Sequence, residues 1–127
     1  MDALLMWVCS AVLAGVAIAV AVVVHLIGLG RIAPTPMLGL PGSRLRADAT
    51  TYRTVHRAAT PLTWLSCSIA AAAALGSLIA AGAAASEEWA ILVILAVVVL
   101  VVGLALATWR AHSALADDAP GDDRTTG

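Results

Sequence analysis

The sequence has no Lys, Asn, Gln or Phe, and charged residues make up only 12% of its 127 positions. Hydrophobic residues make up 61%, and the mean hydropathy is +0.97. So few polar side chains cannot cover a water-facing surface, which excludes an ordinary soluble domain. We therefore expect an integral membrane protein. Abundant Ala, Val, Leu, Gly and Arg are typical of a high-GC bacterial genome, so we place it in the bacterial inner (cytoplasmic) membrane.

Patterns that carry catalysis or bind metal are also missing. The three histidines, His25, His56 and His112, do not form i, i+3 or i, i+4 pairs, and neither Cys nor Ser has a His or an acid at motif spacing. We therefore expect no enzyme, no cofactor, no metal and no nucleic-acid partner, and no small-molecule substrate is evident. His25 lies inside an apolar run, where it is either a functional group or a neutral imidazole bonded to headgroups or water.

Three apolar runs are long enough to cross a hydrocarbon core of ~30 Å at 1.5 Å per residue. They cover residues 4–29, 61–85 and 89–109. The first follows Asp2 instead of a basic region and exceeds the ~7–15 apolar residues of a signal peptide. The sequence thus predicts an all-α membrane protein with three transmembrane helices in a single domain, residues 1–116. Residues 117–127 are predicted to form a disordered acidic tail.

The residues that begin the second and third runs predict how the chain turns there. Thr60 is a candidate N-cap before Pro61, and a residue that precedes proline avoids helical angles, so we expect a break or bend at Thr60. Ser86 is a candidate cap for the third helix, with Glu87 and Glu88 in its first turn. So short a connection predicts a tight antiparallel hairpin.

The second and third apolar runs differ in the size of their side chains. In the second, Ala72, Gly76, Ala80 and Ala84 recur every four residues, and small residues permit close approach of another helix. We expect this run to be the interior helix. The third is rich in Val and Leu and poor in small residues, which suits a face toward lipid or toward a partner.

Cationic residues predict the orientation. Five of the seven lie in the central segment: Arg31, Arg44, Arg46, Arg53 and Arg57. Cationic residues near span ends are retained in the cytoplasm, so this segment and the C-terminus, which follows Arg110, should lie inside and the N-terminus outside. The same topology separates Cys9 from Cys67 and excludes a disulfide between them.

The tryptophans provide an independent test of this topology. Each lies at a predicted span end, at positions 7, 64, 89 and 109. Indole rings favour the membrane–water interface, so we expect all of them to be interfacial anchors.

The central segment, residues 31–60, is predicted to lie at the inner membrane interface. Its first part is rich in Pro and Gly, and after it one helical face holds Leu45, Ala49, Tyr52, Val55 and Ala59. Arg46, Arg53 and Arg57 line another face, and Asp48 is a candidate N-cap. This pattern predicts a short amphipathic helix with its guanidinium groups at anionic headgroups of the inner leaflet. The alternative is a solvated basic loop that acts only as a topology signal.

Part of this segment resembles a known family. The matching residues are Gly39-Leu40, Tyr52-Arg53 and His56-Arg57-Ala58-Ala59-Thr60-Pro61. They are similar to the pattern of SdpI-type small membrane proteins, in which a Gly-Ile-Arg turn precedes a short helix bearing Trp, then His-Arg, then a span. The match covers about residues 35–68. The chain departs from the pattern where Thr35, Pro41, Asp48 and Tyr52 replace Asn, Arg, a capping Ser and Trp.

The resemblance implies a non-enzymatic protein that binds a partner through this segment. The best-known member of the family gives immunity to a secreted toxin and holds a transcriptional repressor at the membrane. The implied partner- or headgroup-binding residues are Gly39, Arg44, Arg46, Tyr52, Arg53, His56 and Arg57. An alternative stays open, because small size without a self-sufficient site is also typical of an accessory subunit of a larger membrane complex, such as a lipid or solute transporter.

Overall fold

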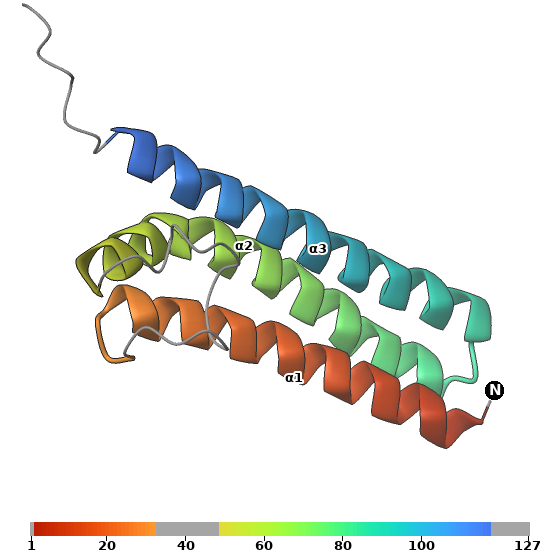
Figure 1. Ribbon diagram of the computed structural model, residues 1–127. Coiled ribbons are helices and arrows are strands. Elements are labelled where there is room, and N and C mark those ends of the chain that lie inside the picture. The colour runs from red at the N-terminus through yellow and green to blue at the C-terminus, as the bar shows by residue number, and fades with distance from the viewer. Residues whose placement is uncertain (1, 33–48, 118–127) are drawn as a thin grey trace, which may run out of the picture.

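A computed structural model describes residues 2–32 and 49–117, and it folds them into three helices. These are α1 (Ala3–Gly28), α2 (Ala49–Gly82) and α3 (Ser86–Asp117). α2 lies between the other two, which pack on it and touch each other little (Figure 1). All three helices are long and apolar enough to cross a membrane. The predicted set of three apolar helices, with the second in the interior, is therefore confirmed.

The helix bounds differ most from the prediction in α2, which begins at Ala49 instead of at residue 61. α1 matches its predicted bounds within one residue, and α3 extends beyond residue 109 to Asp117. The 34 residues of α2 would measure about 51 Å, well over the ~30 Å of a hydrocarbon core. The excess length of α2 and α3 lies at the same end of the bundle (Figure 1).

The predicted break at Thr60 is wrong, because Pro61 lies inside the continuous helix α2. A proline at this position removes the N–H that would bond to the carbonyl of Arg57. Neighbouring hydroxyls bond to the backbone here, Thr60 Oγ1 to the His56 carbonyl at 2.8 Å and Thr63 Oγ1 to the Ala59 carbonyl at 3.0 Å. Packing of α1 and α3 on both sides overrides the local preference, as is common for prolines in transmembrane helices.

No separate interfacial helix forms from residues 49–59, which instead make up the first turns of α2. Val55 and Ala59 lie on the face predicted to be apolar, and both are buried against Ala107 and Ala111 of α3. The apolar face is thus where the pattern predicts it. Its surroundings are another helix of the bundle and not the acyl boundary.

Small residues fill the contact between α1 and α2. The buried positions alternate in steps of three and four, as in a heptad repeat. On α1 they include Ser10, Ala14, Ala17 and Ala21, and on α2 Cys67, Ala70, Ala74, Ser77 and Ala81. The predicted stripe is a different one, and its members Ala72 and Ala84 are exposed. Side chains this small let the two backbones approach closely, which is how helices associate without a hydrophobic driving force.

Most of the buried residues of α3 that face α2 are small. Trp89, Ala96 and Gly103 recur every seven residues and are buried, followed by Ala107 and Ala111. A Cβ atom on Gly103 would collide with the Ser66 side chain. The large Val, Leu and Ile side chains of α3 are mostly exposed. The residues at this seven-residue spacing thus form a narrow strip that packs on α2. The rest of α3 presents a broad apolar surface.

The C-terminal ends of α1 and α2 have recognisable caps. At the end of α1, Gly30 has a φ of 74°, and the Arg31 N–H bonds to the Leu26 carbonyl at 3.0 Å. At the hairpin, Ala84 takes the same left-handed position with a φ of 56°, and the Ala85 N–H bonds to the Ala80 carbonyl. Both are Schellman motifs, which usually use Gly.

The predicted hairpin between the second and third helices is confirmed. α3 begins at Ser86, and the Ala85 carbonyl accepts the Trp89 N–H at 3.0 Å. The capping position is therefore Ala85 and not Ser86. Cys9 is exposed, Cys67 is buried, and both are free thiols.

One tryptophan does not lie at the surface as predicted. Trp89 is 8% exposed, whereas Trp109 is 66% exposed. The Trp89 indole N–H donates to Ser10 Oγ at 3.0 Å, and Ser10 Oγ lies 2.6 Å from Ser77 Oγ. Trp89 therefore joins a buried hydrogen-bond chain across all three helices, and the prediction that it is an interfacial anchor is wrong.

Candidate functional site

Apart from Asp117, the last residue of α3, the charged residues of the bundle are separated by sign. At the end where α1 finishes and α2 begins, the exposed cationic residues are Arg31, Arg53, Arg57 and Arg110. At the opposite end, beside the N-terminus, the exposed acidic residues are Asp2, Glu87 and Glu88 (Figure 1). The helices carry no Asp, Glu, Lys or Arg between the two ends. We call the first of these the arginine end.

The structure divides the predicted site residues into three groups. Gly39, Arg44 and Arg46 lie outside the described residues. Arg53 and Arg57 are exposed on α2. The remaining two, Tyr52 and His56, are buried, with 1% and 0% of their surfaces exposed. The described part of the site therefore presents guanidinium groups to its surroundings while its aromatic groups are packed inside the bundle.

Tyr52 and His56 support the start of α2 from within. His56 Nδ1 lies 2.7 Å from the Tyr52 carbonyl oxygen, which can only accept, so Nδ1 carries the proton. The two rings lie 4.4 Å apart at an interplanar angle of 47°. These contacts fix the register of the turn that carries Arg53 and Arg57.

The last turn of α1 packs directly against this part of α2. A Cβ atom on Gly28 would lie 3.2 Å from the Arg57 Cα, so only a very small residue permits this approach. The Arg53 guanidinium lies over Gly30, where a Cβ atom would collide with it. Gly28 therefore lies against the backbone at Arg57, and Gly30 lies against the side chain of Arg53.

His25 lies one turn deeper, beside Trp64. The rings meet edge to face with centroids 5.9 Å apart. His25 is exposed on α1, and Trp64 is exposed on α2. The pair marks the level of the bundle just inside the arginine end.

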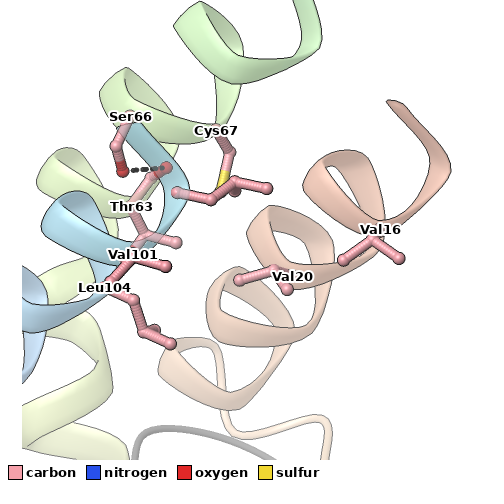
Figure 2. Close-up of a pocket in the computed structure, with 8 residues that line it drawn as sticks. Val16, Val20, Thr63, Ser66, Cys67, Val101 and Leu104 are labelled. Atoms are coloured by element: carbon pink, nitrogen blue, oxygen red, sulfur yellow. Dashed lines mark hydrogen bonds between the residues drawn. The ribbon is translucent and has the colours of Figure 1, made fainter. Parts of the chain in front are cut away.

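A hollow of about 150 Å³ lies between α1 and α3, above α2. Its walls are Val16 and Val20 of α1 and Leu100, Val101 and Leu104 of α3. Its floor consists of Thr63, Ser66 and Cys67 of α2 (Figure 2). We call this hollow the α1–α3 groove. It exists because α1 and α3 both pack on α2 but scarcely touch each other.

The polar atoms on the groove floor are already bonded. Ser66 Oγ donates to the Leu62 carbonyl at 2.8 Å, with the Thr63 carbonyl 3.3 Å away, and Thr63 Oγ1 donates to Ala59. Hydroxyl groups satisfied in this way offer little to a polar ligand. The groove therefore favours an apolar ligand.

Comparison with family models, with curated proteins and with solved structures finds no match to this chain. The resemblance to SdpI-type proteins remains a prediction. Among residues 2–32 and 49–117, no group of three or more His, Cys, Asp or Glu side chains is placed to hold a metal ion.

Sequence reasoning did not find the groove or the buried chain of Ser10, Ser77 and Trp89. The seven-residue spacing of Trp89, Ala96 and Gly103 in the third run was the available signal for the α2–α3 contact. The groove itself had no local signal, because it depends on which faces of three separate helices meet.

Proposed function

We propose that this chain is a non-enzymatic, multi-pass protein of the bacterial inner membrane that binds a partner through its arginine end. The observation that carries the proposal is the pairing of exposed Arg53 and Arg57 with the buried side chains of Tyr52 and His56 on the same helix. A basic loop that acts only as a topology signal needs no rigid support. Here the guanidinium groups belong to α2, which is held in place by contacts with both α1 and α3.

In the proposed orientation the arginine end faces the cytoplasm and the N-terminus and the α2–α3 hairpin face outward. The support is the separation of charge, because cationic span ends are retained inside. Trp64 and Trp109, both exposed, lie near the arginine end, where interfacial aromatic side chains are common.

The partner suggested by the SdpI-like pattern is a protein, of the immunity or signalling type. A soluble regulator or a toxin would meet Arg53 and Arg57 from the cytoplasmic side or the inner interface. Charge complementarity would favour an acidic partner surface, since guanidinium groups bind carboxylates through paired hydrogen bonds.

An accessory subunit of a larger membrane complex is the second candidate. The exposed apolar surface of α3 favours it, because this helix buries mainly small residues against α2. The exposed side chains are Ile91, Ile94, Leu95, Val97, Val98, Val101, Val102, Leu104 and Leu106. A partner span could pack on this surface, as could lipid.

Affinity capture in mild detergent followed by mass spectrometry tests the proposal. We expect Arg53→Gln with Arg57→Gln to abolish recovery of a soluble regulator or toxin while membrane levels stay unchanged. Arg110→Gln, on α3 at the same end but outside the set of predicted binding residues, is the matched control and should retain the partner. His56 is left intact because its side chain is buried and its loss would disturb packing.

Other results would redirect or overturn the proposal. A stoichiometric multi-subunit transporter recovered equally with both variants would favour the accessory role. Full recovery of a soluble partner with the double Arg variant would show that the arginine end is only a topology signal.

A further inference from the structure

The α1–α3 groove does not end at Leu104. Val101 and Leu104 also line a second hollow on α3, together with Ala105, Thr108, Trp109 and His112. Val101 and Leu104 thus belong to the walls of both hollows, which follow one another along α3, and we call the two together the track. The track begins level with the middle of α1 and ends at His112, which is exposed near the arginine end.

The walls of this track are apolar along most of its length, and its hydroxyl groups are bonded to backbone carbonyls. Thr108 Oγ1 donates to the Leu104 carbonyl at 2.8 Å, in the same way as the hydroxyls of the groove floor. An apolar track that ends near the arginine end fits an amphiphile with an apolar tail and an anionic head.

The depth of the groove along the bundle axis also agrees with an acyl chain as its ligand. The groove floor at Cys67 lies ten residues beyond Arg57 on α2, about 15 Å along the helix axis. One leaflet of a ~30 Å hydrocarbon core has about the same thickness. An acyl chain that fills the groove would therefore place its headgroup at the level of the arginines.

We propose that the protein binds one anionic phospholipid, with an acyl chain in the α1–α3 groove and the phosphate headgroup at the arginine end. This inference rests on the proposed function in one respect, that the arginine end faces the inner leaflet. It adds a bound lipid as a ligand, separate from the protein partner. The guanidinium groups of Arg31, Arg53 and Arg57 supply the charge, and the groove supplies the selectivity for a lipid over a free anion.

Native mass spectrometry of the protein in mild detergent tests the proposal with phosphatidylglycerol and phosphatidylcholine added in equal amounts. We expect phosphatidylglycerol to be retained at least about fivefold better, the factor that one cationic side chain at a membrane surface supplies. Arg57→Gln should reduce this preference. Glycerol 3-phosphate, which lacks acyl chains, should not be retained at the same concentration.

Filling the groove separates lipid binding from surface charge. Val20→Phe places a ring in the groove, and we expect it to reduce phosphatidylglycerol retention to the level of phosphatidylcholine. Val22→Phe is the control, since Val22 is exposed on another face of α1 at nearly the same depth. Leu104→Phe fills the groove from the opposite wall and should repeat the loss if Val20→Phe folds poorly.

Three results would overturn the inference: equal retention of the two lipids by the unmodified protein, full phosphatidylglycerol retention by both groove-filling variants, or retention of glycerol 3-phosphate. None of these would affect the capture of a soluble partner through Arg53 and Arg57. Conversely, a failure to recover a protein partner would leave the expected lipid retention unchanged. Each proposal can therefore be overturned without the other.

Discussion

At the scale of single residues, one hydrogen-bond chain links all three helices. Ser77 Oγ lies 2.6 Å from both Ser10 Oγ and the Ala74 carbonyl, and Ser77 has only one proton to donate. Every donor is satisfied if Trp89 donates to Ser10, Ser10 to Ser77, and Ser77 to Ala74. Because no water is available in a bilayer core, such a chain favours one register of the helices over its alternatives.

We expect Trp89→Phe to destabilise the bundle by about 0.6 to 1.7 kcal/mol, the range measured for hydrogen bonds between transmembrane helices. The substitution keeps most of the aromatic packing and removes the N–H donor. Unfolding by a denaturing detergent, followed by circular dichroism, measures the change.

Trp109→Phe is the matched control, because Trp109 is 66% exposed and should tolerate the substitution. Adding Ser10→Ala to Trp89→Phe should cost less than the sum of the single changes. Additive effects would show that the two side chains act independently.

The role of Trp89 could not have been predicted from the sequence. Its position at a span end is typical of an interfacial anchor, and its partner Ser10 lies 79 positions away. The exposed state of Arg53 and Arg57, in contrast, follows from their position opposite the apolar face of the same helix.

At the scale of helices, the continuity of α2 through Pro61 is the main departure from the sequence prediction. We expect spin labels at Thr54 and Ile69, both exposed, to give one narrow distance distribution, with the two Cα atoms about 22 Å apart. Pulsed electron paramagnetic resonance in lipid nanodiscs measures this distance.

Pro61→Ala is the control for that experiment and should leave the distribution unchanged, because the helix is already continuous. A broad or shorter distribution that becomes narrow in Pro61→Ala would restore the predicted break at Thr60.

The contact between Gly103 of α3 and Ser66 of α2 gives a second test at this scale. Gly103→Ala should destabilise the bundle by about 1 to 3 kcal/mol, since the added methyl group overlaps the Ser66 side chain. Ser66→Gly in the same chain should recover much of the loss. Denaturing-detergent titration measures both.

Gly15→Ala provides the matched control, as a Cβ atom there meets nothing within 4 Å. Equal destabilisation by Gly15→Ala and Gly103→Ala would mean that helix flexibility, and not the α2–α3 contact, sets the effect.

The existence and approximate length of the helices could be predicted because apolar length is encoded locally. The first helix was predicted as 4–29 and is Ala3–Gly28. The extension of α2 could not, because Thr60-Pro61 has a strong local preference that only contacts from α1 and α3 outweigh. The seven-residue spacing of Trp89, Ala96 and Gly103 is present in the sequence. It is a weak signal because Val and Leu residues surround it on every side of the helix.

At the scale of the whole molecule, charge is confined to the two ends of an uncharged bundle. The described cations lie at the end where α2 begins, and Asp2, Glu87 and Glu88 lie at the other. This separation is the physical basis for the proposed orientation and for both proposed ligands. The proposed orientation rests on the charge pattern in the sequence, and the helices place the charges at the bundle ends.

Thiol labelling of intact bacterial cells with a membrane-impermeant maleimide tests this orientation most directly. In a background with Cys9→Ala and Cys67→Ala, single cysteines replace Asp2, Glu88, Thr54 or Ala116. We predict that cysteines at positions 2 and 88 are labelled in intact cells, and those at 54 and 116 only after permeabilisation. Labelling of positions 54 and 116 in intact cells, with protection of 2 and 88, would contradict the placement of the arginine end in the cytoplasm.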